Sequence, residues 1–171
     1  MPHKRNRRAN RKGSGNGSAW EVYEGFKQII LSLELKPGEK IREEVICDLL
    51  KCSRTPVREA IIRLVQEGLL EKIPHHGVFV KKFSVKQIME INEVQQLLEP
   101  PTALMALENR TEEDLMELQL NVQNCHRFLA EGNLTDYTME SLRFHQILYN
   151  ASKNSILSQI IQNLREKLII K

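Results

Sequence analysis

The sequence predicts a mainly α-helical protein in two parts: three helices closed by a short β-hairpin, and then a bundle made only of helices. Three observations lead to this prediction. Apolar residues recur at helical spacing through most of the chain after residue 19. Residues 69–82 change instead to two short apolar runs around a turn. The 171 residues, 41% of them hydrophobic, suffice for one domain or two small ones, and no apolar run approaches the roughly 18 residues of a membrane span.

The first 19 residues differ in composition from the rest. They carry six Lys and Arg side chains and no acid, and a Gly/Ser-rich run follows at residues 13–18. Residues 20–83 hold eleven basic and ten acidic side chains, whereas residues 84–171 hold eight and twelve. This pattern predicts a basic flexible arm over residues 1–19 that is attracted to polyanions. A solubilising or expression tail explains the same composition equally well.

Two helices are expected before residue 53. The first spans about residues 19–33 and ends at Lys36-Pro37-Gly38-Glu39. Its apolar stripe consists of Val22, Phe26, Ile29, Ile30 and Leu33. The second spans about residues 43–50, with Ile46, Leu49 and Leu50 facing inward.

Only Lys51-Cys52-Ser53 separates the second helix from a third, which Gly68 ends. Ser53 or Thr55 is expected to cap the third helix, and Pro56 suits its first turn. Two helices joined by a three-residue turn form a helix-turn-helix, whose second helix enters the major groove of DNA. Strands at 69–73 and 78–82 around Pro74-His75-His76-Gly77 add a hairpin. We therefore predict a winged helix-turn-helix over residues 20–83.

One stretch of the third helix and the hairpin carries a specific pattern: Ser53-Arg54-Thr55-Pro56-Val57-Arg58-Glu59-Ala60, Arg63-Leu64, Glu67-Gly68-Leu69-Leu70 and Gly77-Val78-Phe79-Val80. It resembles the DNA-binding domain of GntR-type transcription regulators. The resemblance implies that Arg54 and Arg58 reach guanine edges or phosphates. It places Ser53, Thr55 and Pro56 at the DNA surface, and His75, His76 and Gly77 at the wing tip near the minor groove.

The chemistry agrees, because an arginine fork pairs with guanine O6 and N7. For Arg63, a solvated helical face explains the residue as well as DNA contact does. Arg42 and Lys51 replace the serine and glycine usual in the family, and the paired histidines of the wing are also uncommon. These departures bear on the operator sequence rather than on DNA binding itself.

Residues 84–171 are expected to be helical throughout, over about 85–109, 111–131, 136–151 and 155–171. Pro100-Pro101 should kink or break the first of these helices. The second should bury a stripe of Leu115, Leu118, Val122, Cys125 and Leu129. The last carries a stripe with no later helix to cover it, which predicts self-association. That stripe consists of Ile156, Ile160, Ile161, Leu164 and Leu168.

The residues Glu93-Val94, Leu97-Leu98-Glu99-Pro100, Arg143-Phe144-His145 with Leu148, and Ala151 with Asn154 resemble the helical (FCD-type) effector domain of the FadR-like subfamily. In that family an aspartate and three histidines bind a divalent metal that holds a carboxylate effector. His145 matches one histidine, Ser141 replaces the aspartate, and Gln95 stands where an arginine is common. The two later histidines would fall past Lys171, so we expect an incomplete bundle and no metal site. A hydrogen-bonded core histidine is the alternative for His145.

Together these features predict a homodimeric regulator that binds a palindromic operator in double-stranded DNA and responds to a small organic acid. A DNA-binding module without ligand control is the alternative, because the effector domain is incomplete. We expect no cofactor and no enzymatic activity, since no catalytic motif has a persuasive spacing. Cys47, Cys52 and Cys125 form no CxxC pair and suit inert core thiols of a cytoplasmic protein.

Overall fold

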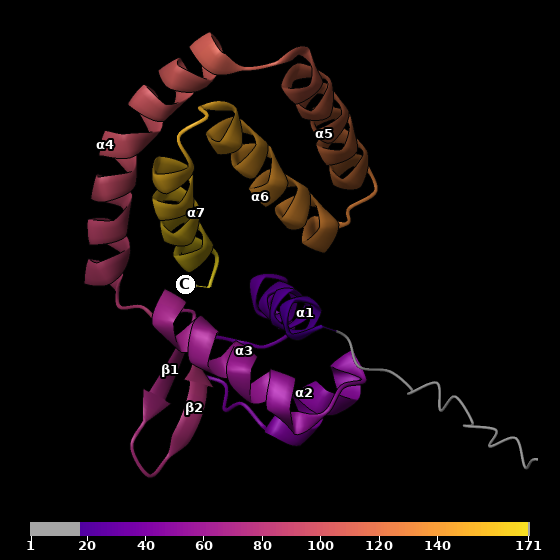
Figure 1. Cartoon of the computed structure of the whole chain (residues 1–171), viewed down its shortest axis with the longest axis vertical. Helices are drawn as coiled ribbons and strands as arrows, with labels where there is room; N and C mark the ends of the chain where they lie inside the picture. The colour runs from indigo at the N-terminus through magenta and orange to yellow at the C-terminus, as the bar shows by residue number, and fades with distance from the viewer. Residues whose placement is uncertain (1–17, 171) are drawn as a thin grey trace, which may run out of the picture.

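The computed structural model describes residues 18–170 and confirms a mainly α-helical chain with one β-hairpin (Figure 1). The predicted basic arm lies almost entirely outside the described residues. The lower part in Figure 1 holds α1 (Ala19–Leu31), α2 (Glu43–Leu50), α3 (Arg54–Glu67) and the strands β1 (Leu70–Ile73) and β2 (Gly77–Val80). The upper part holds α4 (Val85–Asn109), α5 (Glu112–Ala130), α6 (Leu134–Ala151) and α7 (Ser155–Ile169).

Helix α1 begins with a capping box in which the Ser18 hydroxyl accepts from the amide of Glu21, while the Glu21 carboxylate accepts from the amide of Ser18. The helix ends at Leu31, two residues earlier than expected. Leu33 lies beyond it with φ of 62° and 43% of its surface exposed, so its predicted place in the apolar stripe is wrong. Leu35 is buried there instead, because the left-handed turn redirects the chain.

The helix-turn-helix forms where the sequence predicts it. Lys51 takes the left-handed conformation between α2 and α3, with φ of 50°. Ser53 is the N-cap of α3, as predicted, although its side chain makes no capping hydrogen bond. Ile46 is buried on the inner side of α2, as expected, whereas Leu49 is 53% exposed, so its predicted inward position is wrong.

The hairpin is antiparallel, with Leu70 opposite Val80 and Ile73 opposite Gly77. The segment before α2 extends it, because the amide of Ile41 donates to the carbonyl of Val78 and the amide of Val80 donates to that of Glu39. In Figure 1 the hairpin points away from α4–α7. No part of α4–α7 covers the tip of the hairpin in this view.

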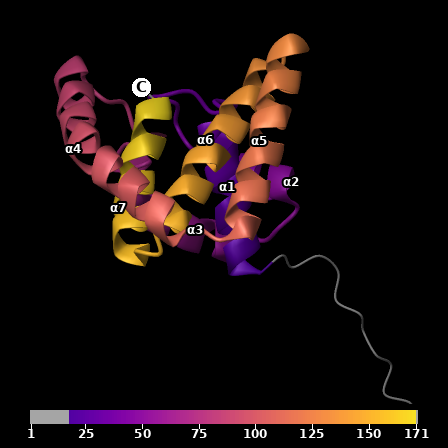
Figure 2. The ribbon, with the colours of Figure 1, turned by 90° about the horizontal axis from the view of Figure 1, so that it is seen from above.

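In the upper part α7 lies between α4 and α6, and α5 packs on the outer side of α6 (Figure 2). The expectation of an uncovered α7 is therefore wrong for Ile161, which is fully buried, although Ile156 and Ile160 are exposed. The prolines do not break α4, which runs unbroken through Pro100 and Pro101 and bends along its length in Figure 1. On α5, Val122 and Leu129 are exposed, contrary to expectation.

The two parts are joined by a shared core. The buried cluster of the first part includes Phe26, Ile30 and Leu64, and Ile170 from the far end of the chain is fully buried in it. Met139 and Leu142 of α6 pack against the same cluster. Among the helices of residues 18–170, none has the length and apolar character needed to cross a bilayer.

Candidate nucleic-acid interface and interdomain cavity

The first turns of α3 present polar side chains on one surface. Arg54, Thr55 and Arg58 are exposed, while Val57 and Ala60 on the other side of the helix are buried against α1. Ser53 is exposed and Pro56 is half-buried. The apolar spacing of α3 thus fixes which side chains face outward, and it brings most of the predicted DNA contacts together at the start of one helix.

Both arginines of this surface meet carboxylates of α2. Arg54 Nη2 lies 3.1 Å from Glu44 Oε1, and Arg58 Nε lies 2.8 Å from Glu43 Oε2. The side chains of Arg54, Glu44 and Arg58 are more than half exposed and that of Glu43 is 32% exposed, so solvent screens both ion pairs and each contributes little to folding. Sequence reasoning did not identify Glu43 and Glu44, because their proximity to the arginines depends on how α2 packs on α3.

Arg63 is placed differently from the other two arginines. Its guanidinium lies over the Tyr23 ring at 4.1 Å and the Trp20 ring at 4.6 Å, and its Nε is 3.5 Å from Glu67 Oε1. These contacts use its planar cation in packing against α1. These contacts favour a packing role for Arg63 over contact with DNA.

The wing tip depends on Gly77, whose φ of 113° is a conformation that other residues rarely adopt. A Cβ at this position would also lie 3.1 Å from Lys40 Cε. Lys40 Nζ is 5.9 Å from the centre of the Phe79 ring, so this lysine packs on the hairpin that carries the exposed His75 and His76. The sequence showed Lys40 only as an isolated charge in a loop, with no signal that it joins the wing.

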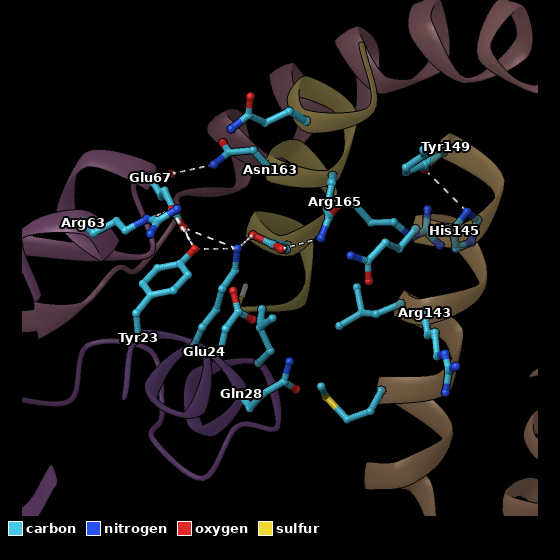
Figure 3. A pocket seen from close by; sticks show the side chains of 18 of the residues that line it. Tyr23, Glu24, Gln28, Arg63, Glu67, Arg143, His145, Tyr149, Asn163 and Arg165 are labelled. Carbon is cyan, nitrogen blue, oxygen red and sulfur yellow. Dashed lines mark hydrogen bonds and ion pairs between the residues drawn. The ribbon is translucent and has the colours of Figure 1, made fainter. Parts of the chain in front are cut away.

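A cavity of about 560 Å³ separates α1 and α3 from α6 and α7 (Figure 3). At its wall Lys27 Nζ lies 2.8 Å from Glu166 Oε2 and 3.4 Å from Glu67 Oε2. The Tyr23 hydroxyl donates to Glu67, and the Asn163 side chain donates to the Glu67 carbonyl. These partly buried polar contacts connect the end of α3 to α7.

Burial and neighbouring charges together set the pKa values of this cluster. Burial and the hydrogen bond to Glu67 raise the pKa of Tyr23 to about 12. Although burial alone lowers the pKa of Lys27, the carboxylates of Glu166 and Glu67 raise it above its ordinary value. Burial raises the pKa of Glu166, and Lys27 opposes that shift. The ammonium is therefore firmly charged, and the charge of Glu166 depends on it.

The predicted effector residues do not share one cavity. His145 and Arg165 line the interdomain cavity, whereas Ser141 lines a separate one of about 200 Å³ beside Leu168. Gln95 is 4% exposed and donates to Glu99 at 2.8 Å. Glu99 was not singled out as a site residue, yet it forms the centre of this group.

His145 belongs to the same polar network. Its Nδ1 is 3.4 Å from the Tyr149 hydroxyl, which donates to Glu99 Oε1 at 2.6 Å, and Arg165 Nη1 is 3.1 Å from that carboxylate. Burial and the nearby Arg165 cation lower the pKa of His145 to about 4, despite the opposing charge of Glu99. Over residues 18–170 no three His, Cys, Asp or Glu side chains converge as metal ligands would.

Comparison with known families and proteins matches both parts of the chain. Residues 19–80 match the model of bacterial regulatory proteins of the gntR family, and residues 90–170 match the FCD domain. The chain is 32% identical over 130 residues to the HTH-type transcriptional regulator McbR of Escherichia coli, covering 76% of this chain and 59% of McbR. It is 30% identical to the HTH-type transcriptional regulator LutR of Bacillus subtilis, covering 80% of this chain and 68% of LutR.

The HTH-type transcriptional repressor RspR of Escherichia coli is 27% identical, and the chain covers 64% of its length. The chain thus spans less than two thirds of McbR and of RspR. Among solved structures, Escherichia coli McbR superimposes with a TM-score of 0.82 at 28% identity, covering 91% of this chain and 74% of the other. A GntR-type regulator from Rhodococcus, at 19% identity and a TM-score of 0.72, shares the fold.

Proposed function

Because the chain belongs to the GntR family of bacterial transcription regulators and carries an FCD domain, we propose that it binds a palindromic operator as a homodimer through α3 and the wing. It is a DNA-binding regulator of transcription and not an enzyme. The observation that carries the proposal is the surface formed by Arg54, Thr55 and Arg58, beside a hairpin whose tip is open to solvent. A helix N-terminus that presents arginines and a hydroxyl suits base edges and phosphates.

The test is a titration of Arg58→Ala against a duplex selected by the wild-type protein from a random library. We expect binding to weaken by about 1–3 kcal/mol and the base preference to relax at one position of each half-site. Arg127→Ala, which removes an exposed arginine from α5, is the matched control and should leave binding unchanged. An Arg58→Ala protein with unaltered sequence preference would contradict the proposed contact.

Exposed apolar side chains support the dimer. Leu97, Leu104 and Leu107 of α4 are each more than half exposed. Such side chains on one helix favour association with a second apolar surface. Sedimentation equilibrium should show a dimer that Leu97→Glu with Leu104→Glu dissociates, whereas Lys86→Glu near the start of α4 should leave it intact.

We also propose that a small organic acid controls DNA binding from the interdomain cavity, where Arg143 and Arg165 are cations that suit a carboxylate. A module without ligand control is the second candidate. The contacts of Arg165 with Glu99 and of Arg143 with Glu117 favour it, because both cations are already paired. Thermal unfolding in a panel of mono- and dicarboxylic acids separates the two, since a ligand of the native state raises the melting temperature. A rise that Arg165→Gln abolishes supports ligand control, and no rise across the panel supports the simple module.

A further inference from the structure

We propose that Glu43 is a positioning residue that holds Arg58 ready to read a base, whereas Glu44 competes with DNA for Arg54. The inference rests on the proposed function, because it requires that α3 faces the DNA. It assigns opposite effects to two neighbouring carboxylates on the same turn of α2. The assignment follows from which nitrogen of each guanidinium the carboxylate contacts.

A guanidinium donates through Nε and through two terminal nitrogens, and a bidentate contact with guanine needs two neighbouring N–H groups. Glu43 contacts Arg58 at Nε, 2.8 Å away. Both terminal nitrogens of Arg58 therefore stay available as a pair. Glu44 contacts Arg54 at Nη2, 3.1 Å away, so one of the four terminal N–H groups of Arg54 is already directed at a carboxylate.

The exposure of the two carboxylates also distinguishes Glu43 from Glu44. The Glu43 side chain is 32% exposed and that of Glu44 is 65% exposed. A half-buried carboxylate on a helix end is a fixed partner, and it restricts an otherwise mobile arginine. The more exposed carboxylate of Glu44 is held less firmly, and its pair is more readily exchanged for a phosphate or a base.

Both carboxylates repel the phosphate backbone, so each reduces attraction to DNA of any sequence. Only Glu43 offsets this effect at the operator, because the Arg58 side chain that it orders meets a matching guanine there. Glu43 is thus expected to increase discrimination between operator and other DNA. Glu44 is expected to lower affinity for all sequences alike.

A structural role must be separated from this one, because Glu43 and Glu44 stand in the first turn of α2, where acids stabilise the helix dipole. Glu44 controls for that role, since it lies beside Glu43 in the same first turn. Asp48 provides the control for charge alone, since it is an exposed acid of α2 with no ion pair among residues 18–170. The Asp48→Asn variant removes one negative charge from the same helix without freeing an arginine. Thermal unfolding of each variant reports any loss of helix stability.

The experiment measures binding of the wild type and of Glu43→Ala, Glu44→Ala, Asp48→Asn and Arg58→Ala to the selected duplex and to a scrambled duplex at two salt concentrations. We expect Glu43→Ala to bind the selected duplex about three- to tenfold more weakly and the scrambled duplex no more weakly than wild type. Glu44→Ala should bind both duplexes about two- to fivefold more tightly. Adding Glu43→Ala to Arg58→Ala should cause no further loss, because its effect passes through that arginine.

The outcomes distinguish the DNA contact of Arg58 from the positioning role of Glu43. If Arg58→Ala keeps the preference for the selected duplex, the proposed DNA contact is wrong and the role of Glu43 falls with it. If Arg58→Ala loses the preference but Glu43→Ala tightens both duplexes as Glu44→Ala does, only the positioning role is overturned. The positioning role would also be overturned if Glu43→Ala weakened binding to both duplexes equally and lowered the melting temperature while Asp48→Asn did neither. The role of Glu43 would then be structural.

Discussion

Replacing Lys27 with methionine should destabilise the protein by an amount that depends on pH. The Lys27 and Glu166 side chains are 13% and 4% exposed, and their charged atoms lie 2.8 Å apart. Removing one partner of a buried ion pair costs about 3–5 kcal/mol, because the other charge is left in a poorly solvated place. Here the cost has an upper limit, since Glu166 can take up a proton.

That limit follows from the ordinary pKa of the Glu166 carboxyl group. The ordinary pKa of a glutamic acid is 4.5, so keeping Glu166 protonated at pH 7 spans 2.5 pH units, which corresponds to roughly 3.4 kcal/mol at 1.36 kcal/mol per unit. In Lys27→Met the pKa of Glu166 in the folded state rises further above its unfolded value. The folded state then binds more protons than the unfolded state, so acidification stabilises the variant relative to the wild type. The deficit should shrink by about 1.4 kcal/mol per pH unit between pH 7 and pH 5.

Urea unfolding of both proteins at pH 8, 7, 6 and 5 measures this difference. Lys86→Met is the control, because Lys86 is 85% exposed and its pair with Glu90 contributes less than about 0.5 kcal/mol. Adding Glu166→Leu to Lys27→Met should restore most of the stability at pH 7, since an apolar pair replaces a buried charge. A deficit below about 1 kcal/mol at pH 7, or one of equal size at every pH, would refute this reasoning.

Three further predictions concern the wing, the histidine and metal binding. Gly77→Ala should weaken binding to selected and scrambled duplexes alike and lower stability by about 1–2 kcal/mol, because its φ is 113° and Lys40 must move; unchanged urea unfolding and DNA titrations would contradict it. The imidazole of His145, identified in NMR spectra by loss of its signal in His145→Gln, should stay neutral from pH 8 to pH 5.5, because its pKa is lowered to about 4; a midpoint near pH 6.5 would show that the ring is solvated. Calorimetric titration with zinc should detect no tight stoichiometric site in this chain, because no three ligands converge over residues 18–170; one bound ion per chain that His145→Ala removes would contradict it.

The helix-turn-helix and the hairpin were predictable because their signals are local. Gly68 ends α3, three residues separate α2 from α3, and the change of apolar period at residues 69–82 marks the strands. Leu49 and Leu33 were predicted wrongly because their burial depends on contacts that are not local. Helical spacing identifies an apolar stripe, but its outer edge is decided by the neighbouring element, and a left-handed turn at Leu33 moves that residue out of the helix.

The candidate site was predictable only in part. The exposure of Arg54 and Arg58 could be predicted, because the apolar spacing of α3 fixes which side of the helix faces outward; their contact with DNA stays a prediction. Their carboxylate partners, the stacking of Arg63 on Trp20 and the pairing of Lys27 with Glu166 depend on how helices pack across long sequence separations. No periodicity in one sequence reports such contacts.

The burial of Ile170 in the core of the first part has a consequence for how the chain folds during synthesis. Phe26, Ile30 and Leu64 emerge from the ribosome long before Ile170 does, and the cluster that they share stays incomplete until the end of α7 arrives. Contacts between such distant residues slow folding, because the intervening chain must first be ordered. The nascent helix-turn-helix is therefore expected to expose apolar surface while α4–α7 are still being made, and exposed apolar surface of this kind is prone to association.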